Sequence, residues 1–127
     1  MKKVAVVIVC LLAVAVLTNG CCNVAAKRDE ARAKACSANM RVMQGCIEMY
    51  NMDHSEMMKT PEFSMFQEGG VMMQEKLLRQ PIQLPSEKCS YLFHGDFSII
   101  DDVPEAGVIK CSEHGSVADI EAKYSRR

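Results

Sequence analysis

The pattern of apolar and polar positions divides the chain into a helical first half and a strand-rich last third. Residues 4–17 contain no charged or strongly polar side chain, and neither 4–26 nor 31–53 contains Pro. Within residues 31–53 apolar side chains recur at helical spacing, which predicts one long amphipathic helix continuous with the apolar run. The predicted buried face of this helix consists of Ala35, Val42, Met43, Cys46, Ile47 and Tyr50.

Short elements are predicted in the middle of the chain. The long helix should end within residues 51–60, where Asn, Asp and Ser side chains compete for backbone hydrogen bonds. Thr60 and Pro61 form a good helix start, and residues 71–79 read as a second short helix that ends before Pro81.

The last third predicts strands. Residues 90–94, 97–101 and 107–111 are short runs rich in Tyr, Phe, Val and Ile, which is typical of a three-stranded antiparallel meander. Residues 117–124 predict a terminal helical turn. The predicted fold class is therefore α+β, with a long N-terminal helix packed on a small antiparallel sheet of about three strands.

The N-terminal segment, residues 1–26, reads as a membrane anchor or signal segment in front of a domain at 27–127. The apolar run 4–17 spans about 21 Å as a helix, short of the roughly 30 Å hydrocarbon core, so a spanning helix must extend to Ala26. Three interpretations stay open: an uncleaved anchor, a signal peptide cut after Ala26, or lipidation at Cys21. All three place the domain outside the cytoplasm.

Two stretches of the helix and one near the C-terminus carry a family resemblance. They are Ala-x-x-Lys-Ala-Cys-x-Ala-Asn-Met-Arg at 31–41, Ile-Glu-Met-Tyr-Asn-Met-Asp at 47–53 and Cys-Ser-Glu-His-Gly at 111–115. In this order they resemble bacterial type IV pilin-like proteins, including the pseudopilins of type II secretion systems. The residues that match the family pattern are Cys36, Asn39, Glu48, Tyr50, His114 and Gly115.

The resemblance implies a membrane-spanning stem, a head in the periplasm or outside the cell, and assembly with other pilin-like subunits through the stems. The family's N-terminal processing signature is missing, since residues 1–17 have no Gly before the apolar run and no Glu within it. The resemblance therefore implies the fold and a place at the bacterial inner membrane, rather than the family's cleavage and methylation step.

Charge and composition exclude several functions. A net charge of −1 and the absence of Trp give no basis for binding nucleic acid, which needs a basic surface or stacking aromatics. The chain has no phosphate-binding Gly-rich loop and no Ser nucleophile motif, so no enzyme activity and no cofactor are expected. Asp101, Asp102 and Glu105 could offer calcium ligands, but a solvated turn explains them better.

The seven cysteines suggest covalent or metal cross-linking of the head. Cys89 and Cys111 bracket the predicted meander, and a disulfide between them would contribute about 3 kcal/mol on the chain-entropy model. Cys36 and Cys46 lie about 15 Å apart along one helix, so they cannot pair with each other. Each is expected to be a buried thiol, unless one of them meets a strand Cys instead.

The competing interpretation of these cysteines is a Cys₂His₂ zinc site. Its predicted ligands are Cys89, His94, Cys111 and His114. In the absence of metal, His114 is expected to bond a backbone group in a turn, with Gly115 at positive φ.

Taken together, the sequence predicts a non-enzymatic, membrane-anchored pilin-like component of a secretion or pilus-type system. An exported lipoprotein or secreted binding module that reuses the same fold is the alternative.

Overall fold

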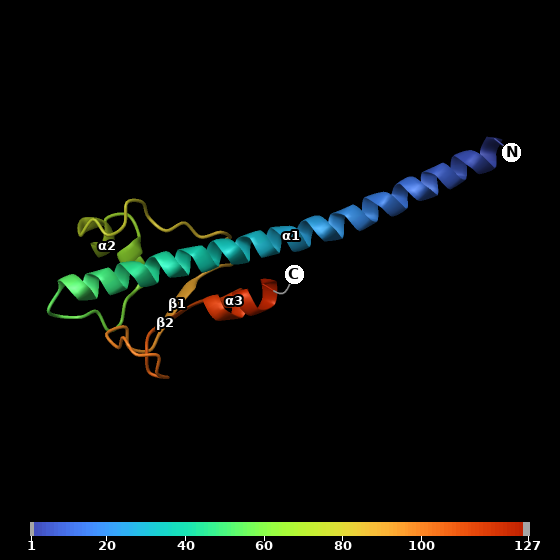
Figure 1. The fold of residues 1–127 in the computed structure, drawn as a ribbon. Helices are drawn as coiled ribbons and strands as arrows, with labels where there is room; N and C mark the ends of the chain where they lie inside the picture. The colour runs from blue at the N-terminus through green and yellow to red at the C-terminus, as the bar shows by residue number, and fades with distance from the viewer. Residues whose placement is uncertain (1, 126–127) are drawn as a thin grey trace. The chain divides into compact units, whose positions relative to one another are not determined.

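The computed structural model describes the backbone of residues 2–125 and the side chains of residues 23–125. The chain divides into two compact units, Met1–Ala31 and Arg32–Arg127. The second unit, the head, holds every element except the first part of α1 (Figure 1). In chain order the elements are α1 (Lys2–Asp53), the 3₁₀ helix η1 (Phe63–Phe66), α2 (Val71–Gln74), β1 (Tyr91–His94), β2 (Val108–Cys111), β3 (Gly115–Ser116) and α3 (Val117–Tyr124).

One face of α1 is buried in the core of the head. We call this row of side chains the core stripe. Its members are spaced three or four residues apart, as expected for one face of a helix. They are Ala33, Cys36, Met40, Met43 and Ile47, none more than 1% exposed. Phe66 and Met72, which follow α1 in the chain, pack into the same core.

A second apolar row, the outer stripe, runs along the exposed side of α1. It consists of Ala35, Ala38, Val42, Gly45, Met49 and Met52. Val42 is 46% exposed and Met52 is 84% exposed. The prediction that Ala35 and Val42 are buried is therefore wrong, whereas Met43 and Ile47 are buried as predicted. Both stripes have helical spacing, so periodicity alone does not indicate which one the head covers.

The sheet is antiparallel with strand order β1-β2-β3, which confirms the predicted α+β class and the number of strands. Tyr91 pairs with Cys111 in the β1–β2 register. Side chains alternate across the sheet, so Tyr91, Ile109 and Cys111 are buried, whereas Leu92 and His94 are exposed. The buried side of the sheet contributes to the same core as the core stripe.

The predicted strand at residues 97–101 is wrong. The Asp96 carboxylate instead accepts hydrogen bonds from the backbone N–H of Ser98 (2.8 Å) and from its hydroxyl (2.5 Å), which closes a turn. Phe97 then enters the core, 6% exposed, against Gly107, where a Cβ atom would collide with the Phe97 ring. The third strand is β3, at residues 115–116, where no strand is predicted.

The predicted helix at 71–79 is shorter in the structure because it ends in a Schellman-type closure. The Leu77 N–H donates to the Met72 carbonyl (2.9 Å) and the Lys76 N–H to that of Met73 (3.1 Å). Lys76 takes the left-handed conformation at φ 59°, which stops α2 at Gln74. The predicted helix start at Thr60 and Pro61 gives only η1.

α3 confirms the predicted C-terminal helical turn. It begins with a capping box, in which the Ser116 hydroxyl accepts from the Asp119 N–H and the Asp119 carboxylate accepts from the Ser116 N–H. Ile120 is buried in the core. Arg41 of α1 and Glu121 of α3 form an ion pair, but both are exposed, so it adds little stability.

Within the part of the chain that was described, no helix has a stretch long and apolar enough to cross a membrane. The predicted anchor at 1–26 falls mostly on residues 1–22, whose side chains lie outside the described residues, as does the predicted lipidation site Cys21.

Core-stripe residues should carry much more of the stability than outer-stripe residues of the same type. Met40 is 1% exposed and Met49 is 53% exposed on the same helix. We expect Met40→Ala to lower the free energy of unfolding by about 2–5 kcal/mol, because it leaves a cavity. The matched change Met49→Ala should stay within about 0.5 kcal/mol of the wild type. Urea unfolding followed by circular dichroism measures both, and equal losses would contradict this assignment of the two faces.

Candidate metal centre

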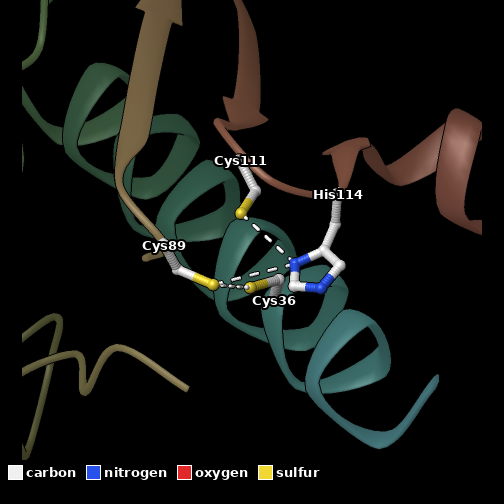
Figure 2. A group of neighbouring side chains, drawn as sticks. All are labelled: Cys36, Cys89, Cys111 and His114. Atoms are coloured by element: carbon white, nitrogen blue, oxygen red, sulfur yellow. Dashed lines mark hydrogen bonds between the residues drawn. The ribbon is translucent and has the colours of Figure 1, made fainter. Parts of the chain in front are cut away.

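Four side chains from different parts of the head meet at one point. They are Cys36 of α1, Cys89 just before β1, Cys111 at the end of β2 and His114 in the turn that follows; we call them the Cys₃His cluster (Figure 2). Their sulfur and imidazole nitrogen atoms all lie within 4.8 Å of one another. Cys36, Cys89 and Cys111 are at most 3% exposed, and His114 is partly buried at the rim.

Three contacts in the cluster link all four donors. The sulfurs of Cys36 and Cys89 are 3.7 Å apart. His114 Nδ1 lies 3.5 Å from the sulfur of Cys111 and 3.7 Å from that of Cys89. In Figure 2 the three thiols and the imidazole point toward a common centre.

The sheet places two of the thiols on one face. Cys111 is opposite Tyr91 in the β1–β2 register, and Cys89 precedes Tyr91 by two residues, so all three side chains share the buried face. Ser112 extends the hydrogen bonding between the two strands past Cys111 by pairing with Ser90. Its N–H donates to the Ser90 carbonyl (2.9 Å), and its hydroxyl accepts from the Ser90 N–H (3.0 Å).

His114 is positioned by the turn between β2 and β3. Gly115 has φ 81°, which confirms the positive φ predicted there. A Cβ atom at Gly115 would lie 2.8 Å from the Asp119 carboxylate of the capping box, so both conformation and space favour glycine. The turn thereby directs the imidazole of His114 back toward the thiols.

Asn39 holds α1 against the sheet one turn beyond Cys36. Its side-chain amide donates to the Gln83 carbonyl (2.7 Å) and to the Tyr91 hydroxyl (2.9 Å). Asn39 is therefore a positioning residue: its hydrogen bonds fix α1 along its axis relative to β1, and thereby place Cys36 beside Cys89.

Burial controls the ionisation of these groups. It raises the pKa of the Cys36 thiol and that of the Cys89 thiol above the ordinary value of 9.0. It also raises the pKa of the Tyr91 hydroxyl. Without a compensating cation, Cys36 and Cys89 are neutral thiols at pH 7.

The predicted Cys89–Cys111 disulfide is not formed in the structure, where both are free thiols. The sulfur of Cys111 lies 3.5 Å from His114 Nδ1, and the sulfur of Cys89 lies 3.7 Å from that of Cys36. The separation of 3.7 Å between Cys36 and Cys89 is far longer than a disulfide bond of about 2.05 Å.

The cluster retains three of the four predicted zinc ligands and replaces one. Cys89, Cys111 and His114 are present, but His94 is exposed on the other face of β1 and pairs with Val108 at the far end of the strand. Cys36 takes the fourth position. No pattern in the sequence marks it as a ligand, because only the packing of α1 against the sheet brings it to the other three.

The other predicted residues lie outside the cluster. Glu48 is exposed and accepts a hydrogen bond from the Gln44 amide (3.1 Å). Tyr50 stacks on His54 with ring centroids 3.8 Å apart. The buried thiol of Cys46 lies 3.5 Å from the Leu77 carbonyl.

Acidic residues form no second centre in the part of the chain whose side chains are described. Among residues 23–125 the Cys₃His cluster is the one group with metal-ligand geometry, and Asp101, Asp102 and Glu105 are exposed residues outside it.

Comparisons with known proteins do not extend these observations: no family model, no curated protein and no solved structure matches the chain.

Burial of the Cys46 thiol is expected to make the stability of the head depend on pH. Burial raises the pKa of its thiol above 9.0 in the native chain, whereas the unfolded chain keeps the ordinary value. Below about pH 9 the thiol is protonated in both states, and above it only the unfolded state ionises, so stability falls as pH rises. We expect Cys46→Ala to lose less stability than the wild type between about pH 8 and pH 10. Urea unfolding across this range tests the difference, and identical pH profiles would refute it.

Proposed function

We propose that the chain is a non-enzymatic, pilin-like structural subunit that assembles with other pilin-like subunits through α1. In this proposal residues 1–26 anchor the protein at the bacterial inner membrane, and the head lies on the periplasmic or outer side. The outer stripe is the observation that carries the proposal.

The outer stripe has the form expected of a helix–helix contact. Its members recur every three or four residues, as in the seam of packed helices. Ala35, Ala38 and Gly45 are small enough to let a second helix approach, and a Cβ added at Gly45 would meet no atom within 4 Å. Apolar side chains as exposed as Met49 and Met52 are stabilised when a neighbouring surface covers them.

The arrangement of the Cys₃His cluster disfavours catalysis. A catalytic cysteine works as a thiolate that its substrate can reach. Cys111 is only 2% exposed, and burial raises the pKa of Cys36 and that of Cys89. These thiols suit a structural role better than a nucleophilic one.

Crosslinking of the full chain in membranes tests assembly through the outer stripe. The wild type should give a ladder of crosslinked oligomers. Met49→Glu should reduce dimer yield about tenfold or more, because a charge buried in an apolar contact costs well over 1.4 kcal/mol.

Leu92→Glu is the matched control. Leu92 is 47% exposed on β1, close to the 53% of Met49, but it lies outside the outer stripe. This variant should crosslink like the wild type. A wild-type chain that stays monomeric in membranes, or equal effects of the two substitutions, would overturn the proposal.

A further inference from the structure

We propose that Cys36, Cys89, Cys111 and His114 bind one zinc ion as a closed, structural Cys₃His site. The ligand atoms would be the three sulfurs and Nδ1 of His114. This inference does not depend on assembly through α1, because it rests on the interior of a single head.

Three of the six separations between donors match those around one tetrahedral ion. Zinc bonds of about 2.3 Å to sulfur and about 2.0–2.1 Å to nitrogen place two sulfurs about 3.8 Å apart and a sulfur and a nitrogen about 3.6 Å apart. The observed separations are 3.7 Å between Cys36 and Cys89, 3.5 Å between Cys111 and His114, and 3.7 Å between Cys89 and His114. These three separations already match a zinc coordination shell, and the remaining ones, which reach at most 4.8 Å, would close by up to about 1 Å when the ion binds.

The donor set selects zinc over other occupants. Three thiolates with one imidazole is a common structural zinc set, whereas calcium and magnesium prefer oxygen donors. An iron–sulfur cluster distributes its cysteines over several irons, which requires wider separations than the 4.8 Å that encloses all four donors here.

Four protein ligands leave no coordination position for water or substrate, so the site is structural. Binding displaces the protons of the three thiols to solvent and converts them to thiolates, and the neutral imidazole donates its Nδ1 lone pair. The zinc charge compensates thiolates that burial otherwise makes costly. Neither oxidation nor reduction is involved.

The ion would join parts of the chain that are distant in sequence. Cys36 lies 53 residues before Cys89, and His114 lies 25 residues after it. A structural zinc site contributes directly to folding, so the contact between α1 and the sheet should depend on the metal.

The experiment measures metal in the full chain, purified in detergent under reducing conditions after expression with zinc. Elemental analysis should find about one zinc ion per chain. Replacement by Co²⁺ should give the intense visible absorption of a tetrahedral cobalt–thiolate centre. A strong chelator should lower the thermal unfolding midpoint.

Substitutions assign the ion to its ligands. Cys111→Ser and His114→Ala should reduce bound zinc about tenfold or more, whereas His114→Cys should retain it, because it restores four suitable donors. Cys46→Ser and His94→Ala are matched controls that should keep about one ion per chain. Cys46 is a buried cysteine on the same helix as Cys36, and His94 is the histidine of β1 outside the cluster.

The cobalt titration uses the wild type, so it tests the site even if a ligand variant fails to fold. Folded, reduced wild type that binds neither zinc nor cobalt would overturn the site. Loss of metal in Cys46→Ser or His94→Ala equal to that in His114→Ala would overturn the ligand assignment. Iron in place of zinc in the purified chain would overturn the choice of metal.

Discussion

The close approach of three buried sulfurs and one imidazole where α1 meets the sheet is the constraint on which the head depends. Three features bring the four donors to this point: a helix face for Cys36, strand alternation for Cys89 and Cys111, and a glycine turn for His114. Buried polar or ionisable groups are costly unless they are satisfied together. The head therefore has to place α1, the start of β1 and the β2–β3 turn correctly relative to one another at the same time.

The same contact explains why α1 has two apolar faces with different roles. The side that carries Cys36 and Met40 is covered by the head, and the side that carries Val42 and Met49 is left exposed. Met40 and Met49 are nine residues apart, about two and a half turns, so they lie on opposite sides of the helix. Methionine thus fills the core on one side of α1 and lies exposed at the surface on the other.

Sequence reasoning predicted the elements better than their contacts. The long helix, the strands that hold Tyr91 and Ile109, and the C-terminal helix follow from periodicity and composition. Phe97 was wrongly assigned to a strand because an aromatic residue followed by Ser and Ile is typical of strand sequences. In the structure the turn at Asp96 directs Phe97 into the core, where its ring fills the space that a side chain at Gly107 would occupy. That choice depends on a tertiary contact that no local pattern contains.

The metal centre was predictable to the extent that its ligands are local. Cys111 and His114 are three residues apart and form a recognisable pair, and Cys89 lies at the start of a strand. Cys36 gave no such signal, because only the packing of α1 against the sheet brings it to the others. His94 failed as a ligand because strand alternation points it to the exposed face, which depends on the register with β2.

The distribution of the cluster along the chain also determines when the head can be completed. A chain is synthesised from its N-terminus, and the donors at 36, 89, 111 and 114 appear in that order. Until the last of them has left the ribosome, the nascent chain holds an incomplete ligand set and cannot close its coordination shell. Completion of the centre thus requires a chain synthesised past His114, and a chain that stops before it holds only part of the ligand set.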